Sequence, residues 1–222
     1  MPVWRGAQQT LNPGPDNIIM FKAVGLECVK GYDSLFTDVN FTLSAGEVMQ
    51  IQGTNGSGKT SLLRILTGMS QAESGEIFWD GCSIDENRES FNENLVYIGH
   101  LNSLKAELSA IENLQLSRQY LGQTNDRTTE SALEAVGLAG YEHILAHQLS
   151  AGQKRRVALA RLYLTTAPLW ILDEPTTAID VDGVKAFEQT IEAHALNGGM
   201  VILTAHQTLN FGKANIRSLS LT

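Results

Sequence analysis

Residues 53–60 form a glycine-rich segment, GTNGSGKT, that few folds can accommodate. The β-prone run EVMQIQ precedes the loop, and KTSLLRILTGM, whose apolar residues have helical spacing, follows it. This strand–loop–helix order is the context in which the pattern G-x-x-x-x-G-K-[ST] cradles phosphate groups. Glycines suit such a loop because its backbone N–H groups must all point inward, in conformations that side chains would block. The loop therefore predicts an α/β fold with a phosphate site.

We expect the last residues of this loop to contact a nucleotide. Lys59 would neutralise the β- and γ-phosphates, and the Thr60 hydroxyl would bind Mg²⁺, a hard cation that prefers oxygen ligands. A glycine-rich turn that binds nothing is the alternative, and the flanking strand and helix disfavour it. The expected phosphate-binding residues are Gly53, Thr54, Asn55, Gly56, Ser57, Gly58, Lys59, Thr60 and Ser61.

Two carboxylates follow the apolar run LWIL in the segment LWILDEP. Open α/β sheets bind their ligands at the carboxyl ends of parallel strands. Asp173 suits a direct or water-mediated contact with magnesium, and Glu174 suits a general base that polarises an attacking water. A carboxylate pair at a strand end is otherwise often a helix cap, so this prediction depends on the glycine-rich loop lying nearby.

A second candidate anion site lies in LSAGQKRRVALARL, residues 149–162. Its small-residue turn runs into a basic helix-forming stretch, and a helix N-terminus offers unpaired N–H groups and the positive end of the dipole to a phosphate. The cations that follow, Lys154, Arg155 and Arg156, are expected on the exposed side of the helix, in solvent, with direct phosphate contact as the alternative. The candidate residues of this turn are Leu149, Ser150, Ala151, Gly152 and Gln153.

The order of the predicted elements indicates one domain. Between residues 18 and 52, short β-prone runs predict an antiparallel patch that leads into one buried strand. Residues 109–140 carry apolar side chains at three- and four-residue steps, which predicts a helical lobe inserted at about residues 101–165. Elsewhere strands and helices alternate, and apolar strands such as MVIL are typical of a mainly parallel sheet buried on both faces. We predict one α/β domain over residues 18–222 and a flexible extension over residues 1–17.

Composition narrows the possible functions. The chain has 222 residues, enough for one full-sized domain, and its net charge of −8 argues against holding nucleic acid through a general basic field. No run approaches the roughly 20 apolar residues that cross a bilayer, and no signal-peptide layout is present. We therefore expect a cytoplasmic protein that contacts membranes only through partners. Cys28 and Cys82 lack metal-ligand spacing and are expected to be buried thiols.

The segments GTNGSGKT, LSAGQ, ILDEP, AID and LTAH, in this order, resemble the nucleotide-binding subunits of ABC transporters from residue 18 onward. The resemblance implies a P-loop NTPase core that hydrolyses ATP with Mg²⁺. It also implies a head-to-tail homodimer, in which the LSAGQ turn of one subunit closes over ATP held by the other and excludes water. Ser150 and Gly152 would contact the γ-phosphate, and Gln153 would brace the turn.

The resemblance assigns roles to two further residues. His206, in LTAH, would contact the γ-phosphate and hold the attacking water in line with Glu174. Asp180, in TAID, would belong to the loop that crosses to the other subunit's site. An N-cap for the following helix is the alternative interpretation of Asp180, and both roles are compatible.

The sequence departs from the family pattern at three positions. The family has a glutamine that touches magnesium and links the core to the lobe, whereas LVYIG is followed by His100. Because an imidazole nitrogen is a poor Mg²⁺ ligand, we expect His100 to couple the lobe to the nucleotide through a water. Ala151 replaces a glycine, a mild change unless its φ is positive. Tyr32 is the nearest candidate for stacking on adenine, with an ordinary surface tyrosine as an equal alternative.

The segments IGH, QLSAGQKRRVALARL, TAIDVDG and GGMVILTAHQ are most similar to the ATP-binding subunits of bacterial cytochrome c maturation, or haem exporter, systems. This similarity implies integral membrane partners, a peripheral location on the cytoplasmic face of the inner membrane, and a partner-facing groove near residues 100–107. ATP hydrolysis would drive either export of haem or release of a haem-loaded chaperone, and the sequence does not distinguish the two. The alternatives are a transporter of another substrate and a soluble ABC protein acting on nucleic acid or ribosomes. We interpret His143 and His147 as an exposed helix pair, not as haem ligands.

Overall fold

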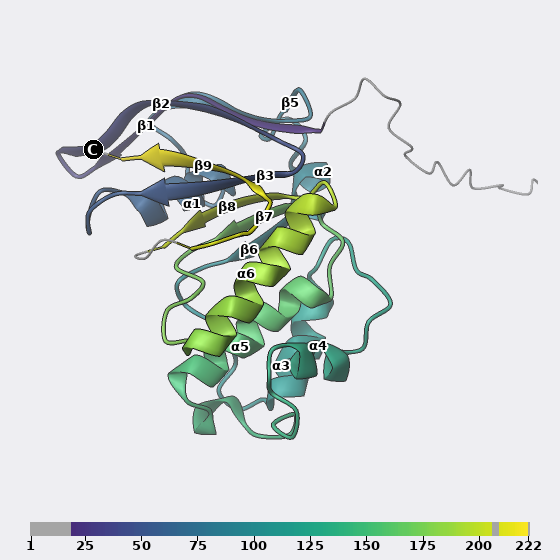
Figure 1. Ribbon diagram of the computed structural model, residues 1–222. Coiled ribbons are helices and arrows are strands. Elements are labelled where there is room, and N and C mark those ends of the chain that lie inside the picture. Colours follow the sequence, from purple (N-terminus) through teal and green to yellow (C-terminus); the bar gives the residue numbers. More distant parts are fainter. Residues whose placement is uncertain (1–18, 206–208, 222) are drawn as a thin grey trace, which may run out of the picture.

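The computed structural model describes residues 19–205 and 209–221. Figure 1 shows an antiparallel sheet above a parallel sheet, with helices beneath that continue into a separate lobe. The strands are β1 (Met20–Lys30), β2 (Asp33–Ser44), β3 (Glu47–Gln52), β4 (Ser74–Trp79), β5 (Cys82–Ser83), β6 (Leu95–Ile98), β7 (Leu169–Leu172), β8 (Met200–Thr204) and β9 (Asn215–Ser220). The helices are α1 (Lys59–Leu66), α2 (Arg88–Glu93), α3 (Ala110–Arg118), α4 (Thr129–Ala135), α5 (Ala151–Ala160) and α6 (Val181–Leu196).

The parallel sheet positions the residues that were expected to carry the chemistry. Its strand order is β6-β7-β8-β3-β9, and each neighbouring pair is parallel. Every residue of β7 and β8 is buried, as their continuous apolar runs predicted. Parallel pairing brings the carboxyl ends of β3, β7 and β8 to one edge. The glycine-rich loop after β3 therefore lies beside the carboxylates that follow β7.

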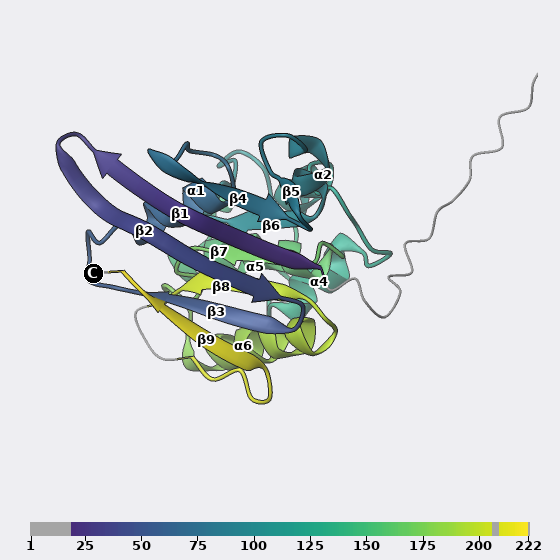
Figure 2. The same cartoon turned by 90° about the horizontal axis from the view of Figure 1, so that it is seen from above.

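The antiparallel sheet, in the order β2-β1-β4-β5, covers one face of the parallel sheet with α1 between them (Figure 2). Burying each large apolar side chain in this layer stabilises the fold by about 1.5–3 kcal/mol. The helix after the glycine-rich loop is thereby fixed from both sides. Its contacts belong to one core cluster that includes Phe21, Leu43, Ile51, Leu62, Leu66 and Ile171.

The other face of the parallel sheet packs against α5 and α6, and the lobe has a core of its own. The second cluster joins Trp170 and Val201 of the sheet to Leu159 of α5 and Ile191 of α6. The third cluster joins α3 and α4 to α5. The predicted fold class is thus confirmed: an α/β core with a mainly parallel sheet, an N-terminal antiparallel patch and an inserted helical lobe. The domain limits stay predictions, and the extension over residues 1–17 lies outside the described residues.

Helix α6 begins directly after Asp180, where a helix was expected to follow that residue. The Asp180 carboxylate accepts a hydrogen bond from the Gly183 N–H at 2.8 Å, so the N-cap interpretation of Asp180 is confirmed. With 16 residues, α6 is too short to cross a bilayer, and no helix in the described part of the chain is both long and apolar enough to do so.

Helix α3 begins at a capping box in the lobe. The Ser109 hydroxyl accepts from the Glu112 N–H, while the Glu112 carboxylate accepts from the Ser109 N–H at 2.8 Å and from its hydroxyl at 2.6 Å. These bonds to the Ser109 side chain and backbone lower the pKa of Glu112. Such a cap orients the chain that enters the lobe from β6.

The expectation of buried thiols is wrong. Cys82 is exposed because it lies in the two-residue edge strand β5, and Cys28 is only partly buried, in the irregular end of β1 where the pairing with β2 shifts register. Partial burial still raises the pKa of the Cys28 thiol. Helix α2 was also not anticipated; it is short and buries Phe91.

His143 and His147 are exposed, as expected, but they are not on one helix. His143 lies in a turn, and His147 lies in the 3₁₀ helix Ala146–Gln148. Leu145, between them, pairs with Ser109 in an isolated bridge, which interrupts any helix there. The i, i+4 spacing therefore does not place the two imidazoles on a common helical face.

His194 on α6 is packed against the sheet in its neutral form. Its ring stacks on Trp170 with centroids 3.6 Å apart, and its Nε2 lies 3.1 Å from the Pro168 carbonyl oxygen, to which the neutral ring donates. Burial lowers the pKa of His194 to about 4, although the bond to Pro168 acts in the opposite direction. The imidazolium form is thus disfavoured in the folded state.

We expect this histidine to make the protein less stable in mild acid. Because the unfolded state binds the proton near pH 6.5 and the folded state only near pH 4, stability is complete above pH 6.5 and falls as the pH drops toward 4. Between pH 7.5 and pH 5 the free energy of unfolding should fall by about 2 kcal/mol from this group. Urea unfolding of the wild type and of His194→Gln at pH 7.5 and at pH 5 measures this fall in the free energy of unfolding. An equal pH dependence in the two proteins would contradict the assignment.

Candidate nucleotide site

The glycine-rich loop is built around a buried lysine. Lys59 is only 8% exposed, and its ammonium group donates to the carbonyl oxygens of Gly53 at 2.8 Å and Thr54 at 2.9 Å. Gly58 forms the N-cap of α1, and its carbonyl accepts from the Leu62 N–H at 2.8 Å. The loop therefore wraps around its own cation at the start of a buried helix, where the dipole favours an anion.

The glycines of the loop have backbone conformations that other residues rarely adopt. Gly56 and Gly58 have φ of 88° and 91°. At Gly53 the limit is space, because a Cβ would lie 2.4 Å from the Ser57 hydroxyl oxygen. That oxygen is buried and has no hydrogen-bond partner among residues 19–205 and 209–221. A buried hydroxyl without a partner, beside a buried cation, fits a phosphate oxygen as the missing acceptor.

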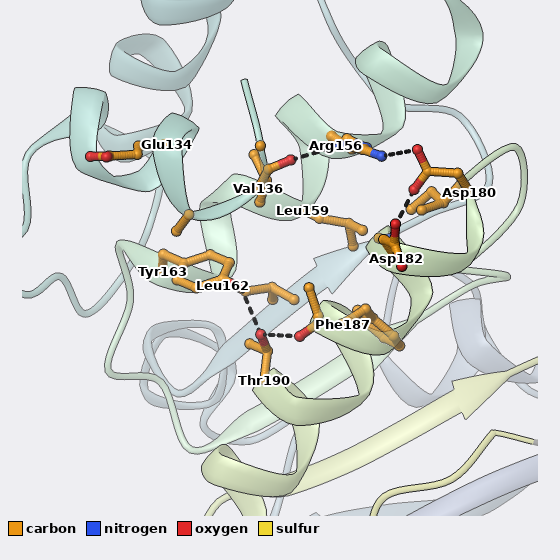
Figure 3. A pocket seen from close by; sticks show the side chains of 15 residues that line it. Glu134, Val136, Arg156, Leu159, Leu162, Tyr163, Asp180, Asp182, Phe187 and Thr190 are labelled. Atoms are coloured by element: carbon orange, nitrogen blue, oxygen red, sulfur yellow. Dashed lines mark hydrogen bonds and ion pairs between the residues drawn. The ribbon is translucent and has the colours of Figure 1, made fainter. Parts of the chain in front are cut away.

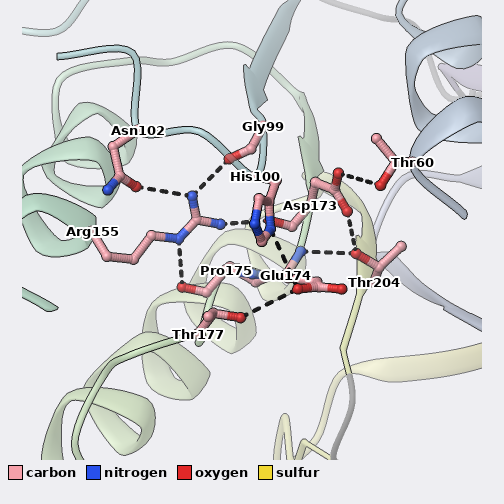
Figure 4. Close-up of polar contacts among 10 residues, drawn as sticks. All are labelled: Thr60, Gly99, His100, Asn102, Arg155, Asp173, Glu174, Pro175, Thr177 and Thr204. Atoms are coloured by element: carbon pink, nitrogen blue, oxygen red, sulfur yellow. Dashed lines mark hydrogen bonds and ion pairs between the residues drawn. The ribbon is translucent and has the colours of Figure 1, made fainter. Parts of the chain in front are cut away.

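Asp173 is held at the end of β7 by two hydroxyl groups (Figure 4). The Thr60 hydroxyl donates to one carboxylate oxygen and the Thr204 hydroxyl to the other, each at 2.8 Å. Asp173 is 1% exposed, whereas Thr60 is exposed beside it. Hydroxyl and carboxylate oxygens are the ligands that Mg²⁺ prefers, so Thr60 and Asp173 fit the predicted magnesium site.

Glu174 lies directly beyond, on a strained turn. Its φ is 47°, and its backbone N–H donates to the Thr204 hydroxyl at 2.8 Å. Its carboxylate lies 3.4 Å from His100 Nδ1 and accepts from the Thr177 hydroxyl at 3.5 Å. A non-glycine residue held at positive φ by its surroundings is typical of functional sites. His206, predicted to act with Glu174, lies outside the described residues.

The second predicted anion site is a well-formed helix start. The Ser150 hydroxyl accepts from the Gln153 N–H at 3.2 Å, and the Gln153 side chain accepts from the Ser150 N–H at 2.9 Å. Ala151 is already helical, so it needs no positive φ. A Cβ on Gly152 would lie 2.4 Å from the Ala178 carbonyl oxygen, so glycine is required there for close packing. Gln153 thus braces the turn in the geometry, and Ser150 remains exposed.

The expectation that Arg155 lies in solvent is wrong. Arg155 is 3% exposed and donates to the carbonyl oxygens of Asp173 at 2.6 Å, Gly99 at 2.7 Å and Pro175 at 3.1 Å (Figure 4). Burial lowers the pKa of Arg155, and the nearby carboxylates of Asp173 and Glu174 raise it. A run of basic residues is typical of a solvated face, but the helical period turns the middle residue of this run toward the sheet.

Its neighbours Lys154 and Arg156 are half-buried, not fully exposed. Arg156 forms an ion pair of 2.5 Å with Asp180 and donates to the Val136 carbonyl at 3.3 Å (Figure 3). This ion pair lies at the wall of a cavity of about 480 Å³ between α4, α5 and α6. Asp180 is therefore tied to the lobe as well as to the start of α6.

Two further predictions concern Tyr32 and the segment that is expected to face a partner. Tyr32 is fully exposed in the turn between β1 and β2, and the structure shows no contact that distinguishes an adenine-stacking residue from a surface tyrosine. A groove of about 1000 Å³ runs between the core and the lobe and includes Ser103, Leu104 and Lys105 from the segment that was expected to face a partner.

Sequence reasoning missed two residues that hold the site together. Thr204 contacts both Asp173 and Glu174. It lies within the segment LTAH, but the resemblance assigns a role only to the histidine of that segment. The place of Thr204 could have been inferred only from the pairing of β7 with β8. Arg155 could have been found from the 3.6-residue period of α5, which places it three residues after Gly152 on the inner side.

Comparisons with known proteins agree with this geometry. Residues 36–177 match the family model described as ABC transporter. The cytochrome c biogenesis ATP-binding export proteins CcmA of Escherichia coli (strain K12) and Shigella dysenteriae serotype 1 are both 50% identical over 206 residues, which cover 91% of this chain and 97% of each relative.

Solved structures have the same fold. The ATP-binding cassette MJ0796, in a dimeric post-hydrolysis state bound to ADP and Pi, aligns with a TM-score of 0.77 at 23% identity, over 90% of this chain and 94% of that one. A putative ABC transporter ATP-binding protein from Pyrococcus furiosus aligns with a TM-score of 0.76 at 24% identity, over 91% and 97%. The match to the family model and the 50% identity to the CcmA proteins show that the chain belongs to the ABC transporter family, in the group of cytochrome c biogenesis ATP-binding export proteins.

Proposed function

We propose that this chain is the ATP-hydrolysing subunit of a membrane ABC complex for cytochrome c maturation. The observation that carries the proposal is the meeting of the glycine-rich loop with Asp173 and Glu174 at one edge of the sheet, in a chain 50% identical to CcmA over 91% of its length. Export of haem and release of a haem-loaded chaperone are the two forms of work that such a subunit would drive.

The phosphate loop of the site binds ATP through residues 53–61. When ATP binds, the Lys59 ammonium group donates to phosphate oxygens in place of the Gly53 and Thr54 carbonyl oxygens. The backbone N–H groups of the loop and of the first turn of α1 also donate to phosphate oxygens. The Ser57 hydroxyl gains the acceptor that it lacks among the described residues. Thr60 and Asp173 would hold Mg²⁺, which neutralises charge on the terminal phosphates when it is bound.

Glu174 acts as the general base in this mechanism. Its carboxylate accepts a proton from the attacking water, while the Thr204 bond to its backbone N–H keeps it at the strand end. His206 contacts the γ-phosphate and orients the same water. His100, 3.4 Å from the Glu174 carboxylate, links the base to the segment that enters the lobe.

Two copies of the chain enclose each nucleotide, in a head-to-tail homodimer. The start of α5 exposes Ser150 to solvent, and no hydrogen bond joins residues 149–153 to residues 53–61 in the described part of the chain. Such a helix start has donors available for a phosphate on another subunit. Ser150 and Gly152 of one copy contact the γ-phosphate in the other, and Asp180 lies in the loop that crosses between them.

The membrane partner binds in the groove between core and lobe, and it holds this subunit on the cytoplasmic face of the inner membrane. Among the residues that the structure describes, the groove is lined by three cations, Arg88, Lys105 and Arg161, and by no acidic residue, and Arg88 pairs with Asp85 outside the groove at 3.6 Å. Met69 and Tyr120, which are 60% and 81% exposed, add apolar surface. In a chain of net charge −8, this surface fits a partner segment with acidic and apolar side chains.

Complementation of a bacterial strain that lacks this chain tests the proposal. The wild-type chain should restore mature c-type cytochromes, detected by their bound haem, and should co-purify with integral membrane proteins. Lys105→Glu should reduce both, because it places an acidic side chain against an acidic partner. The exposed Lys22, on β1, provides the control: Lys22→Glu should behave as the wild type.

The outcomes separate the possible functions. Normal c-type cytochromes in the strain that lacks the chain would contradict the cytochrome assignment and favour another substrate. Co-purification with nucleic acid or ribosomes, and not with membrane proteins, would contradict the transporter assignment. Equal recovery of membrane partners by Lys105→Glu and by the wild type would remove the groove from the interface.

A further inference from the structure

We infer that Arg155 is a positioning residue that couples the start of α5 to the catalytic strand ends of its own subunit. It does so by holding the segments before His100 and around Glu174 in one place. This inference rests on the proposed function, because it concerns how the two nucleotide sites of a dimer act together.

The guanidinium of Arg155 connects helix α5 to two segments that are distant in sequence, residues 99–102 and residues 173–175. It donates to Gly99 at the end of β6 and to Asp173 and Pro175 at the end of β7, and Nη1 lies 3.3 Å from the Asn102 side-chain oxygen. Figure 4 shows these bonds converging on one side chain next to His100 and Glu174. The two residues flanking Glu174 are thus both bonded to the same helix.

Two further contacts make α5 and the segment after β7 a single unit. The Ala178 carbonyl packs so closely on Gly152 that no side chain fits between them. Arg156 forms an ion pair with Asp180, at the end of the same segment. Helix α5 therefore contacts the segment of residues 173–180 near the start of the segment, in its middle and at its end.

This arrangement connects a surface that serves one nucleotide to a base that serves the other. In the proposed dimer, Ser150 faces ATP bound by the partner subunit, whereas Glu174 faces ATP in its own subunit. When α5 shifts as it closes over the partner's nucleotide, Arg155 carries the shift to the backbone on both sides of Glu174. A displacement of about 1 Å at a reacting group can change turnover by about 100-fold, so a small shift is sufficient.

Arginine makes these bonds better than lysine or glutamine could. Its planar fork presents several N–H donors in fixed directions, and here they reach carbonyl oxygens in the segments that follow two different strands. Lysine keeps the charge but concentrates its donors on one nitrogen, and glutamine keeps two donors without the charge. Both substitutions should therefore release part of the link while leaving the phosphate loop untouched.

The experiment measures turnover and ATP binding in the complex purified with its membrane partners. Arg155→Gln should bind ATP within about twofold of the wild-type affinity, and its turnover per bound ATP should fall at least about tenfold. The Hill coefficient of ATP hydrolysis should fall toward 1, because the two sites no longer communicate. Arg155→Lys should lower turnover per bound ATP and the Hill coefficient as well. This second variant tests the inference if the Arg155→Gln protein does not assemble.

Arg118→Gln is the matched control. Arg118 also uses its guanidinium to bind carbonyls, those of Arg127 at 2.7 Å and Asn125 at 2.6 Å, but within the lobe. The Arg118→Gln substitution should lower the melting temperature without changing turnover per bound ATP. Turnover and Hill coefficient unchanged in both Arg155 variants, or an equal loss in Arg118→Gln, would overturn the inference. Absence of turnover in the wild-type complex would instead contradict the proposed function.

Discussion

Glu174→Gln is expected to lower ATP turnover by at least about 100-fold while ATP still binds. The amide cannot accept a proton from the attacking water, but it has nearly the same shape and keeps the backbone bond to Thr204. Because hydrolysis then fails to release the nucleotide, the variant should accumulate as a closed dimer with ATP enclosed. Phosphate release and size-exclusion chromatography with Mg·ATP measure the two effects.

The control for this variant is a glutamate on the antiparallel sheet. Glu76 on β4 is exposed, so Glu76→Gln removes the same charge from the chain without touching the site. It should leave turnover and dimerisation unchanged. Unchanged turnover in Glu174→Gln would remove Glu174 from the role of base and leave the proton acceptor to be sought among the other groups at this sheet edge.

Lys59→Ala is expected to weaken ATP binding by at least about 100-fold. The substitution removes the cation that would donate to the β- and γ-phosphates, where each charge-assisted hydrogen bond is worth about 1.5–3 kcal/mol. It also leaves the carbonyls of Gly53 and Thr54 without their donor, which affects stability. Titration with a fluorescent ATP analogue measures the dissociation constant. Since Lys59 is buried, the melting temperature of the variant must be measured alongside.

The exposed Lys213 provides the comparison for this loss of charge. Lys213→Ala should bind ATP as the wild type does, because its side chain lies on the surface near β9 and its backbone N–H, which donates to Glu192, is retained. A dissociation constant for a folded Lys59→Ala protein within threefold of the wild-type value would exclude the glycine-rich loop as the main phosphate site.

Local patterns predicted the parts of the fold that depend on neighbouring residues. The glycine-rich loop between a strand and a helix, the apolar runs of β7 and β8, and the cap at Asp180 each lie within a short stretch of chain. In each case the backbone conformation follows from nearby side chains, so a single sequence is sufficient to predict it. The order of the motifs was enough to indicate the family.

The patterns failed where burial depends on packing between distant segments. Arg155 looks like part of a solvated basic run, but its environment comes from carbonyls 18 to 56 residues away in the chain. Cys82 looks like a residue of a buried strand, yet β5 has only two residues at the edge of its sheet. Cys82 carries no local signal for its exposure. The helical period of α5 indicates that Arg155 faces inward, but it does not indicate which carbonyl groups surround the side chain.

The phosphate loop, the run of strands and helices and the helix caps follow from the amino-acid order, because their conformations are set by glycine, by side-chain periodicity and by hydrogen bonds that span a few residues. The convergence of Thr60, Thr204 and Arg155 on Asp173 follows from the strand order β7-β8-β3 and from the packing of α5 on the sheet. Contacts of this kind depend on which strands lie side by side. That choice is made by the burial of whole faces, and no short segment of the chain contains it.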